Sequence, residues 1–404
     1  MSEPLVIVGN GMAAMRLVEN LTQRALGRYA IAVIGEEPQL AYNRVLLSSV
    51  LAQEVSRADI QLKPADWWSE RGVTLLYGYR ATAIDPSIRR VRLGNGATLP
   101  YSKLVLATGS RPLRLNVPGM DLPGVMTFRD LGDVAAIEAA AARGGKAVVI
   151  GGGLLGLEAA YGLAKAGLQV SVLHLMDRLM ERQLDARASA MLKIEVERRG
   201  ISVHLNAETI GMLGASRVRG VELKDGRQLA ADLVVVATGI RANADLARTA
   251  NLTVDRGIVV DDQLRTSRSD IYAIGECIEH RKQCYGLVEP AYEHARVLAT
   301  HLAGEAASYS GTVMATNLKV SGVNVFSAGD FLGAADTEQI VLSDPGLSTY
   351  KKLVIKDGRL VGAVLFGDTA DGLWYFDLIR SGVSIEVFRN DIVFGRAFTE
   401  PQAA

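Results

Sequence analysis

Cysteine is almost absent from this sequence, which contains only Cys277 and Cys284 among its 404 residues. That count excludes a disulfide scaffold and any cluster bound by four thiolates, and it is typical of a reducing cytoplasm. An excess of one charge is also missing, because 44 Lys and Arg residues balance 44 Asp and Glu residues. The balance argues against nucleic acids or anionic membranes as partners, since binding to them requires a basic surplus.

Long hydrophobic runs are missing as well. The most apolar stretch, near residues 148–168, is interrupted by Glu158 and Lys165, so no segment has the length that a membrane-spanning helix needs. A predicted strand begins by Leu5, which leaves no room for a signal peptide. We therefore expect a cytoplasmic protein without a membrane partner. The sequence does not determine the oligomeric state.

Two glycine-rich segments each follow a short apolar strand and precede a predicted helix. We call residues 9–14 the first glycine turn and residues 151–156 the second glycine turn. In such turns one glycine permits a tight bend, the next lets the backbone approach a pyrophosphate, and the helix N-terminus supplies amide donors. Ala14 replaces the third glycine of the first turn, whereas Gly156 completes the second. Two such turns predict two dinucleotides with electrons passing between them.

The rest of the chain repeats this plan. Both glycine turns are followed by a second strand and, further on, by a strand that ends in Ala-Thr-Gly, at residues 107–109 and 237–239. We therefore predict an α/β fold with one dinucleotide-binding domain, residues 116–241, inserted in another that comprises residues 1–115 and 242–316. Alternating strands and the Asp357-Gly358 turn predict a third, antiparallel α+β domain over residues 317–404.

Charged residues near the predicted turns suggest further contacts. Glu36 ends the second strand, where an acid accepts hydrogen bonds from a ribose diol. In the second half we place His174 at this position, with Arg178 close behind; we favour NADH, and NADPH stays open because both side chains could face a 2′-phosphate. Glu158 lies one turn into the second helix, where it points either to a flavin–nicotinamide junction or to solvent.

Residues 41–51, where related flavoproteins often carry a cysteine pair, contain no cysteine, so electrons must pass directly to an outside acceptor. The spacing of Cys277, His280, Cys284 and His294 allows a zinc site or ordinary packing; we favour packing and expect no metal.

Several segments together resemble a known family. The chain resembles the two-dinucleotide FAD reductases that include ferredoxin, rubredoxin and putidaredoxin reductases, with two Rossmann-like domains of the glutathione-reductase type. It is more closely similar to the flavoprotein region of assimilatory nitrite reductase and to the electron-transfer subunit of assimilatory nitrate reductase. Ser49 stands where ferredoxin-type reductases commonly have a lysine, which favours the nitrite and nitrate branch. The segments that carry the resemblance are residues 41–49, 151–159, 179–185, 272–277 and 284–288.

The resemblance implies an FAD-dependent NAD(P)H oxidoreductase in which hydride passes from the nicotinamide to the flavin. The implied acceptor is the catalytic subunit of a nitrate or nitrite reductase; a ferredoxin or rubredoxin reductase that serves an oxygenase is the alternative, and a flavin-dependent redox sensor is the non-enzymatic one. Glu158 is the candidate catalytic residue. The candidate FAD-binding residues are Gly9, Gly11, Met12, Ala13, Ala14, Glu36, Arg44, Ala81, Ala107, Thr108, Gly109, Gly275 and Glu276. The candidate NAD(P)-binding residues are Gly151, Gly152, Gly153, Leu154, Leu155, Gly156, His174, Arg178 and Gly239.

Overall fold

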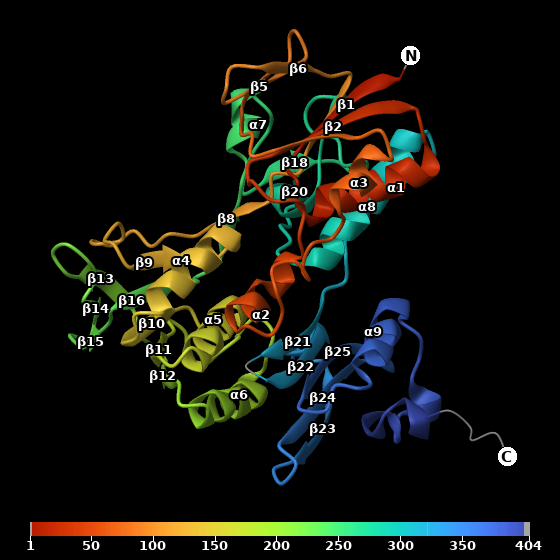
Figure 1. Ribbon diagram of the computed structural model, residues 1–404. Coiled ribbons are helices and arrows are strands. Elements are labelled where there is room, and N and C mark those ends of the chain that lie inside the picture. Colours follow the sequence, from red (N-terminus) through yellow and green to blue (C-terminus); the bar gives the residue numbers. More distant parts are fainter. Residues whose placement is uncertain (1, 321, 400–404) are drawn as a thin grey trace. The chain divides into compact units, whose positions relative to one another are not determined.

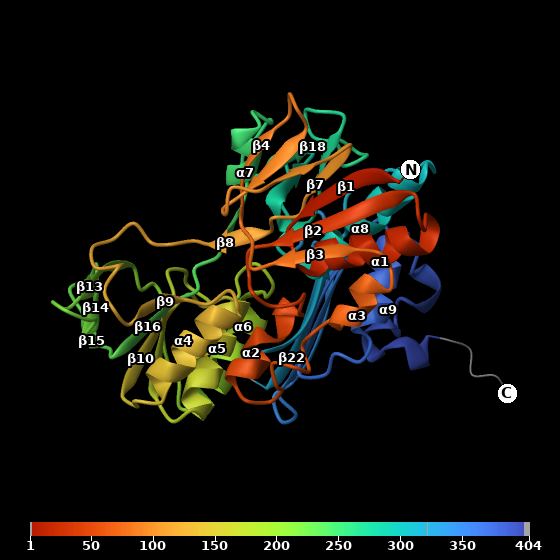
Figure 2. The same cartoon turned by 45° about the horizontal axis from the view of Figure 1, so that its top comes forward.

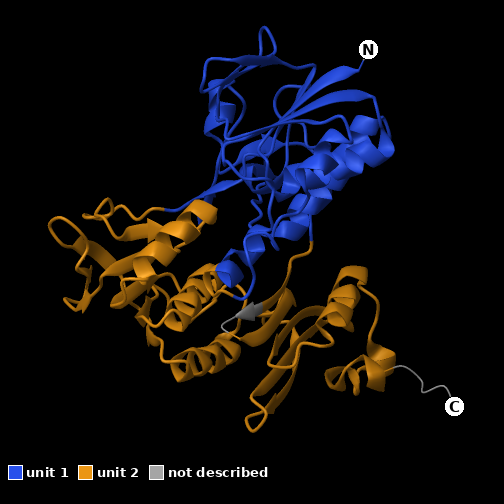
Figure 3. Ribbon diagram, in the orientation of Figure 1, with its two compact units in different colours: residues 1–50, 54–113, 240–312 blue, residues 51–53, 114–239, 313–404 orange. Residues whose placement is uncertain are grey.

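The chain divides into two structural units, each built from separate segments of the sequence (Figure 1, Figure 3). The computed structural model describes residues 2–320 and 322–399. The first unit comprises residues 1–50, 54–113 and 240–312, and the second comprises residues 51–53, 114–239 and 313–404.

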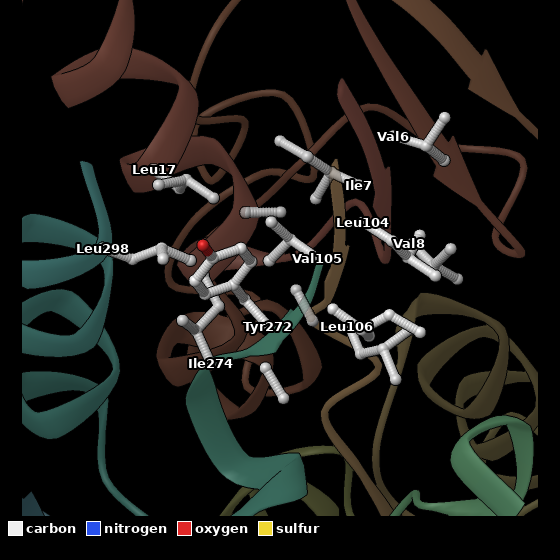
Figure 4. Close-up of a cluster of buried hydrophobic side chains, with 14 of the residues drawn as sticks. Val6, Ile7, Val8, Leu17, Leu104, Val105, Leu106, Tyr272, Ile274 and Leu298 are labelled. Atoms are coloured by element: carbon white, nitrogen blue, oxygen red, sulfur yellow. The ribbon is translucent and has the colours of Figure 1, made fainter. Parts of the chain in front are cut away.

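A five-stranded parallel sheet forms the centre of the first unit. Its central strands are short apolar runs that are mostly buried, as parallel sheets require, whereas the edge strand at residues 74–77 is partly exposed. Figure 2 shows this sheet beside α1 and α8, two helices that pack against each other. Figure 4 shows side chains of three strands, among them Ile7, Val105 and Tyr272, meeting Leu17 of α1 and Leu298 of α8. The strand order is β19 (Ile271–Ala273), β7 (Lys103–Leu106), β1 (Glu3–Val8), β2 (Tyr29–Gly35) and β3 (Thr74–Tyr77), and the helices are α1 (Met12–Arg24) and α8 (Val288–Ala303).

Smaller elements complete the first unit. A three-stranded antiparallel sheet contains a hairpin with its turn at Asn95-Gly96. Of two further strand pairs, one joins residues 110–112 and 240–242, where the chain leaves and re-enters the unit, and the other joins residues 258–260 and 278–280. The elements are η1 (Arg44–Leu46), α2 (Leu47–Leu51), α3 (Ala65–Ser69), β4 (Ala81–Asp85), β5 (Arg90–Leu93), β6 (Thr98–Pro100), β8 (Ser110–Pro112), β17 (Ile240–Ala242), α7 (Asp245–Thr249), β18 (Ile258–Val260), η2 (Gly275–Cys277) and β20 (Ile278–His280).

The second unit contains another five-stranded parallel sheet, built in the same order as the first. Its central strand β10 corresponds to β1, because Ile150 pairs with Leu173 and Val236 as Val8 pairs with Ile34 and Leu106. The strand order is β12 (Ser202–His204), β11 (Gln169–Leu173), β10 (Lys146–Ile150), β16 (Leu233–Val236) and β9 (Val125–Thr127). The accompanying elements are α4 (Leu131–Ala141), α5 (Leu154–Lys165), α6 (Ala186–Arg198), β13 (Thr209–Leu213), β14 (Gly220–Leu223) and β15 (Gln228–Ala230).

The C-terminal part of the second unit is a five-stranded antiparallel sheet with α9 packed on it. Phe326, Leu353 and Tyr375 are buried in the core between them. The strand order is β21 (Ala315–Val320), β22 (Val323–Gly329), β25 (Arg359–Phe366), β24 (Thr349–Lys356) and β23 (Glu338–Asp344), followed by α9 (Gly372–Ser381), η3 (Glu386–Phe388), η4 (Ile392–Phe394) and η5 (Arg396–Phe398).

The predicted fold class is confirmed: two dinucleotide-binding α/β sheets are followed by an antiparallel α+β sheet. The edge strand next to β16 is β9, which precedes the second glycine turn, whereas its counterpart β19 comes late in the chain. The sequence repeat did not predict β9, because three residues with moderate burial carry little pattern. Over the described residues, no helix is long and apolar enough to cross a bilayer.

Candidate functional site

Each glycine turn lies against the end of a neighbouring strand. Gly9 adopts a φ of +116°, and a Cβ placed on it would lie 2.1 Å from the carbonyl oxygen of Ala107, directly after β7. Gly151 adopts a φ of +124°, and its Cβ would lie 2.3 Å from the carbonyl oxygen of Ala237, directly after β16. Only glycine fits both the backbone angle and the space, so the turns pass tightly over the repeated Ala-Thr-Gly segments.

The second glycine of each turn has the opposite surroundings. Gly11 and Gly153 are the N-caps of α1 and α5, and a Cβ on either would have no described atom within 4 Å. As glycines they carry no side chain that could cap the first-turn amides, and the space beside each N-cap is open. A helix N-terminus with free amides and room for close approach suits a pyrophosphate, so the residues present fit the two dinucleotides.

Several predicted FAD residues meet at the first glycine turn. Gly275, in η2, lies against Ala13, because a Cβ on Gly275 would be 3.2 Å from the Cβ of Ala13. The carboxylate of Glu276 accepts a hydrogen bond from the Ser110 hydroxyl at 2.8 Å. Met12 and Ala13 open α1, and Ala14 is fully buried inside it. These residues therefore converge from three separate parts of the chain.

Two residues that hold this site together were not predicted in that role. Asn243 receives a hydrogen bond from the Thr108 hydroxyl at 2.6 Å, and its own backbone amide donates to the carbonyl of Gly109 at 2.9 Å. His294, on α8, accepts a hydrogen bond from the amide of Gly275 through Nδ1 at 3.2 Å. Burial, together with the neighbouring His280, lowers the pKa of His294 to about 3, so the ring stays neutral and keeps its acceptor. The sequence showed His294 only as a metal candidate.

The predicted ribose side of the first site is more open. Glu36 follows β2 with a side chain that is 61% exposed, and it lies 3.6 Å from the guanidinium of Arg80. Arg80 precedes Ala81, the first residue of β4. Arg44 pairs instead with Glu37, which also accepts a hydrogen bond from the Tyr42 hydroxyl. The Glu37–Tyr42–Arg44 group was not predicted, because contacts between side chains on a loop have no period in the sequence.

In the second half, the structure places the predicted residues in two groups. Gly151, Gly152 and Gly153 form the turn, Leu154 and Leu155 open α5, and Gly156 lies so close to Gly151 that its Cβ would meet the Gly151 carbonyl at 2.0 Å. Glu158 is half-buried in α5. Gly239, with a φ of +118°, follows the Ala237 strand end.

The other group follows β11. His174 is buried, and both ring nitrogens are used inside the protein: Nδ1 accepts from the Gly152 amide at 3.0 Å and Nε2 bonds to Glu181 at 3.1 Å. Arg178 pairs with Asp177 at 3.2 Å. By register, Leu175 rather than His174 corresponds to Glu36, because Leu173 corresponds to Ile34. The side chain at the register position of Glu36 is therefore an exposed leucine.

The two cysteines are free thiols of different kinds. Cys277 is buried, donates to the carbonyl of Ile274 at 3.2 Å, and has a pKa raised by burial. Cys284 is exposed. His280 bonds to Asp262 at 2.9 Å, and the described part of the chain has no group of three or more His, Cys, Asp or Glu side chains that could hold a metal ion.

Comparison with known proteins agrees with this geometry. The sequence profile described as pyridine nucleotide-disulphide oxidoreductase matches residues 3–297, and that of the rubredoxin NAD+ reductase C-terminal domain matches residues 315–383. The chain is 45% identical over 382 residues to a nitrite reductase [NAD(P)H] of Bacillus subtilis, covering 94% of this chain and 48% of that protein. It is 40% identical to the assimilatory nitrate reductase electron transfer subunit of Bacillus subtilis, covering 96% and 51%. The chain thus spans about half the length of these relatives.

Among solved structures, the fold matches a ferredoxin reductase from Rhodopseudomonas palustris with a TM-score of 0.86 and 28% identity, covering 95% of this chain and 96% of that one. It also matches the reductase of a covalent putidaredoxin reductase–putidaredoxin complex with a TM-score of 0.85 and 26% identity, covering 95% and 94%.

Proposed function

Because the chain belongs to the pyridine nucleotide-disulphide oxidoreductase family and is an NAD(P)H-dependent FAD oxidoreductase, we propose that it delivers electrons to a separate redox protein. The proposed acceptor is the catalytic part of an assimilatory nitrite or nitrate reductase, and the proposed location is the cytoplasm. The observation that carries the proposal is the pair of glycine turns, each tight at one glycine and open at the next.

We assign FAD to the first glycine turn, in a domain of residues 1–115 and 242–316. The amides that follow Gly11 would hold the pyrophosphate, Glu36 the ribose, and Gly275 with Glu276 the ribityl side. The contact between Gly275 and Ala13 supports this assignment, because it places two predicted FAD segments together. Arg44 would lie on the flavin side, where its partner Glu37 sets the position of the guanidinium.

We assign NAD(P)H to the second glycine turn, in a domain of residues 116–241. The amides that follow Gly153 would hold the coenzyme pyrophosphate, and Gly239 would border the same site. Bound FAD supplies the chemistry, since it takes up a hydride and releases electrons one at a time. The chain itself binds and orients the cofactors, and Glu158 is the acidic residue of α5 that we propose near the nicotinamide.

We propose the domain of residues 317–404 as an interface for other proteins. Its profile match to the rubredoxin NAD+ reductase C-terminal domain supports this proposal. The acceptor proposal draws on the two Bacillus subtilis relatives. The buried position of Cys277 and the lack of cysteine in residues 41–51 support electron delivery without a thiol relay.

Anaerobic stopped-flow spectroscopy tests the proposal. We expect NADH or NADPH to bleach the flavin absorption of the purified protein, and a nitrite or nitrate reductase catalytic protein to restore it. A flavin that neither coenzyme reduces would contradict the assignment of both turns. The Gly153→Ala variant is the matched control, because it should retain FAD and accept electrons from dithionite while needing a higher NAD(P)H concentration for reduction.

A ferredoxin or rubredoxin reductase remains the second candidate, favoured by the structural match to a ferredoxin reductase. Rapid reoxidation by ferredoxin, with none by the nitrite or nitrate reductase protein, would establish it in the same experiment. Family membership sets aside the purely sensory alternative.

A further inference from the structure

Gly152, in the middle of the second glycine turn, is held through both of its backbone polar groups. Its amide donates to Nδ1 of His174 at 3.0 Å, and its carbonyl accepts from the amide of Met180 at 3.0 Å. Both partners belong to residues 174–181, which follow β11. The turn that precedes α5 is therefore held in place by the segment that follows the neighbouring strand β11.

The hydrogen bonds determine which nitrogen of His174 carries the proton. A backbone amide can only donate, so Nδ1 must present its lone pair to Gly152 and the proton lies on Nε2. Nε2 then donates to the carboxylate of Glu181 at 3.1 Å. With both nitrogens used and only 8% of the residue exposed, His174 has no polar atom left for a coenzyme.

The first glycine turn provides an internal comparison. By register, His174 corresponds to Gly35 and Gly152 corresponds to Asn10. A Cβ on Gly35 would lie 2.7 Å from the Cβ of Asn10, and a Cβ on Gly152 would lie 2.7 Å from Cγ of His174. Each half has room for one side chain at this place. In the first half, Asn10 of the glycine turn fills this place. In the second half, His174, directly after β11, fills it.

We propose that His174 is a positioning residue for the NAD(P)H pyrophosphate: its Nδ1 orients Gly152, and thereby the amides after Gly153, without touching the coenzyme. This inference rests on the assignment of NAD(P)H to the second glycine turn. Because the pyrophosphate is common to both coenzymes, the loss of His174 should weaken the binding of NADH and of NADPH by the same factor. A residue that contacted the ribose or a 2′-phosphate would instead discriminate between them.

Steady-state kinetics with both coenzymes test the proposal on the FAD-loaded protein. His174→Leu removes the acceptor, and we expect KM to rise about tenfold for NADH and NADPH alike, as for one lost hydrogen bond to a buried amide, with kcat changed less than KM. His174→Asn places a carbonyl oxygen where Nδ1 was, and it should recover most of the affinity. His204→Asn is the matched control, because the backbone carbonyl of His204, which accepts the amide of His174, is unchanged by the substitution.

Two outcomes would overturn the proposal: a change confined to one coenzyme, or equal loss in His174→Leu and His174→Asn. Wild-type protein that neither coenzyme reduces would count against the proposed function instead, so the two failures are distinguishable. If His174→Leu does not fold, the tautomer of His174 can be measured in the wild-type protein by nitrogen-15 NMR with labelled histidine. We expect the Nε2-protonated tautomer for the ring beside Gly152, and an Nδ1-protonated ring would refute the proposal.

Discussion

At the scale of single residues, the glycines of each turn have two different physical roles. Gly9 and Gly151 have positive φ angles and lie against a carbonyl of the next strand, so they are required by the folded protein itself. Gly11 and Gly153 have open space around them, so any requirement for glycine there comes from the ligand. Substitution separates these roles. A change at Gly9 or Gly151 should mainly affect the stability of the protein, and a change at Gly11 or Gly153 should mainly affect the binding of the dinucleotide.

We expect Gly151→Ala to lower the free energy of unfolding of the second unit by about 1–3 kcal/mol, because the new methyl group collides with the Ala237 carbonyl. Gly153→Ala should destabilise the coenzyme-free protein less than Gly151→Ala, because it only replaces an N-cap glycine and meets no atom within 4 Å, and it should raise KM for NAD(P)H. Thermal unfolding without coenzyme, followed by kinetics, measures both effects. Equal destabilisation by the two substitutions would contradict this division.

Leu175 sets a second prediction, on coenzyme preference. It is 60% exposed and occupies the register position of Glu36. Leu175→Asp introduces an acid that can bond to the ribose diol of NADH and repel the 2′-phosphate of NADPH. We expect the ratio of kcat/KM values to shift towards NADH by about tenfold, or about 1.4 kcal/mol. Leu175→Asn has the same shape without charge and should shift it less; an unchanged ratio in Leu175→Asp would argue against this position.

At the scale of elements, helix α6 links the parallel sheet of the second unit to its C-terminal antiparallel sheet. Asp185 is its N-cap and accepts the amide of Ala188 at 3.0 Å through Oδ1. The other oxygen accepts the hydroxyl of Tyr350, on β24 of the antiparallel sheet, at 2.7 Å. Lys352 lies 3.7 Å from the same oxygen. One buried carboxylate therefore starts a helix and anchors a neighbouring sheet.

Removal of the hydroxyl in Tyr350→Phe should lower the free energy of unfolding by about 1–2 kcal/mol, because the buried Asp185 loses a partner. Asp185→Ala should cost more, since it also removes the helix cap. Chemical denaturation of both single variants and the double variant measures the coupling between the two side chains. Additive effects would show that the bond does not stabilise the unit, and Tyr77→Phe, at an exposed tyrosine, is the control.

At the scale of the whole molecule, the free energy of unfolding depends on pH wherever a buried group has a different pKa in the folded and the unfolded chain. His294 is such a group, because its pKa is lowered from 6.5 to about 3 by burial and by His280. Above pH 6.5 the ring is neutral in both folded and unfolded chains. As the pH falls from about 6.5 towards about 3, only the unfolded chain gains a proton there, so this contribution to stability is progressively lost.

We therefore expect the unfolding temperature to fall between pH 6.5 and pH 4, and the fall to be smaller in His294→Gln, which has no titrating ring. FAD release measured over the same range should begin at higher pH in the wild type than in the variant. His204→Gln serves as a control with a half-buried ring. If the unfolding temperature fell equally steeply with decreasing pH in His294→Gln and in the wild type, groups other than His294 would control the acid sensitivity.

The sequence by itself determined the two glycine turns, the repeated Ala-Thr-Gly strand ends and hence the fold class, because these features depend on local backbone geometry and on short buried strands. Spacing along the chain could not determine which residue after β11 corresponds to Glu36. The tertiary structure decided that, since the pairing of Ile150 with Leu173 places Leu175 there and turns His174 inward. It also brought His294 to Gly275 and Tyr350 to Asp185. Such contacts join side chains from distant elements, and they arise only once the sheets and helices have packed.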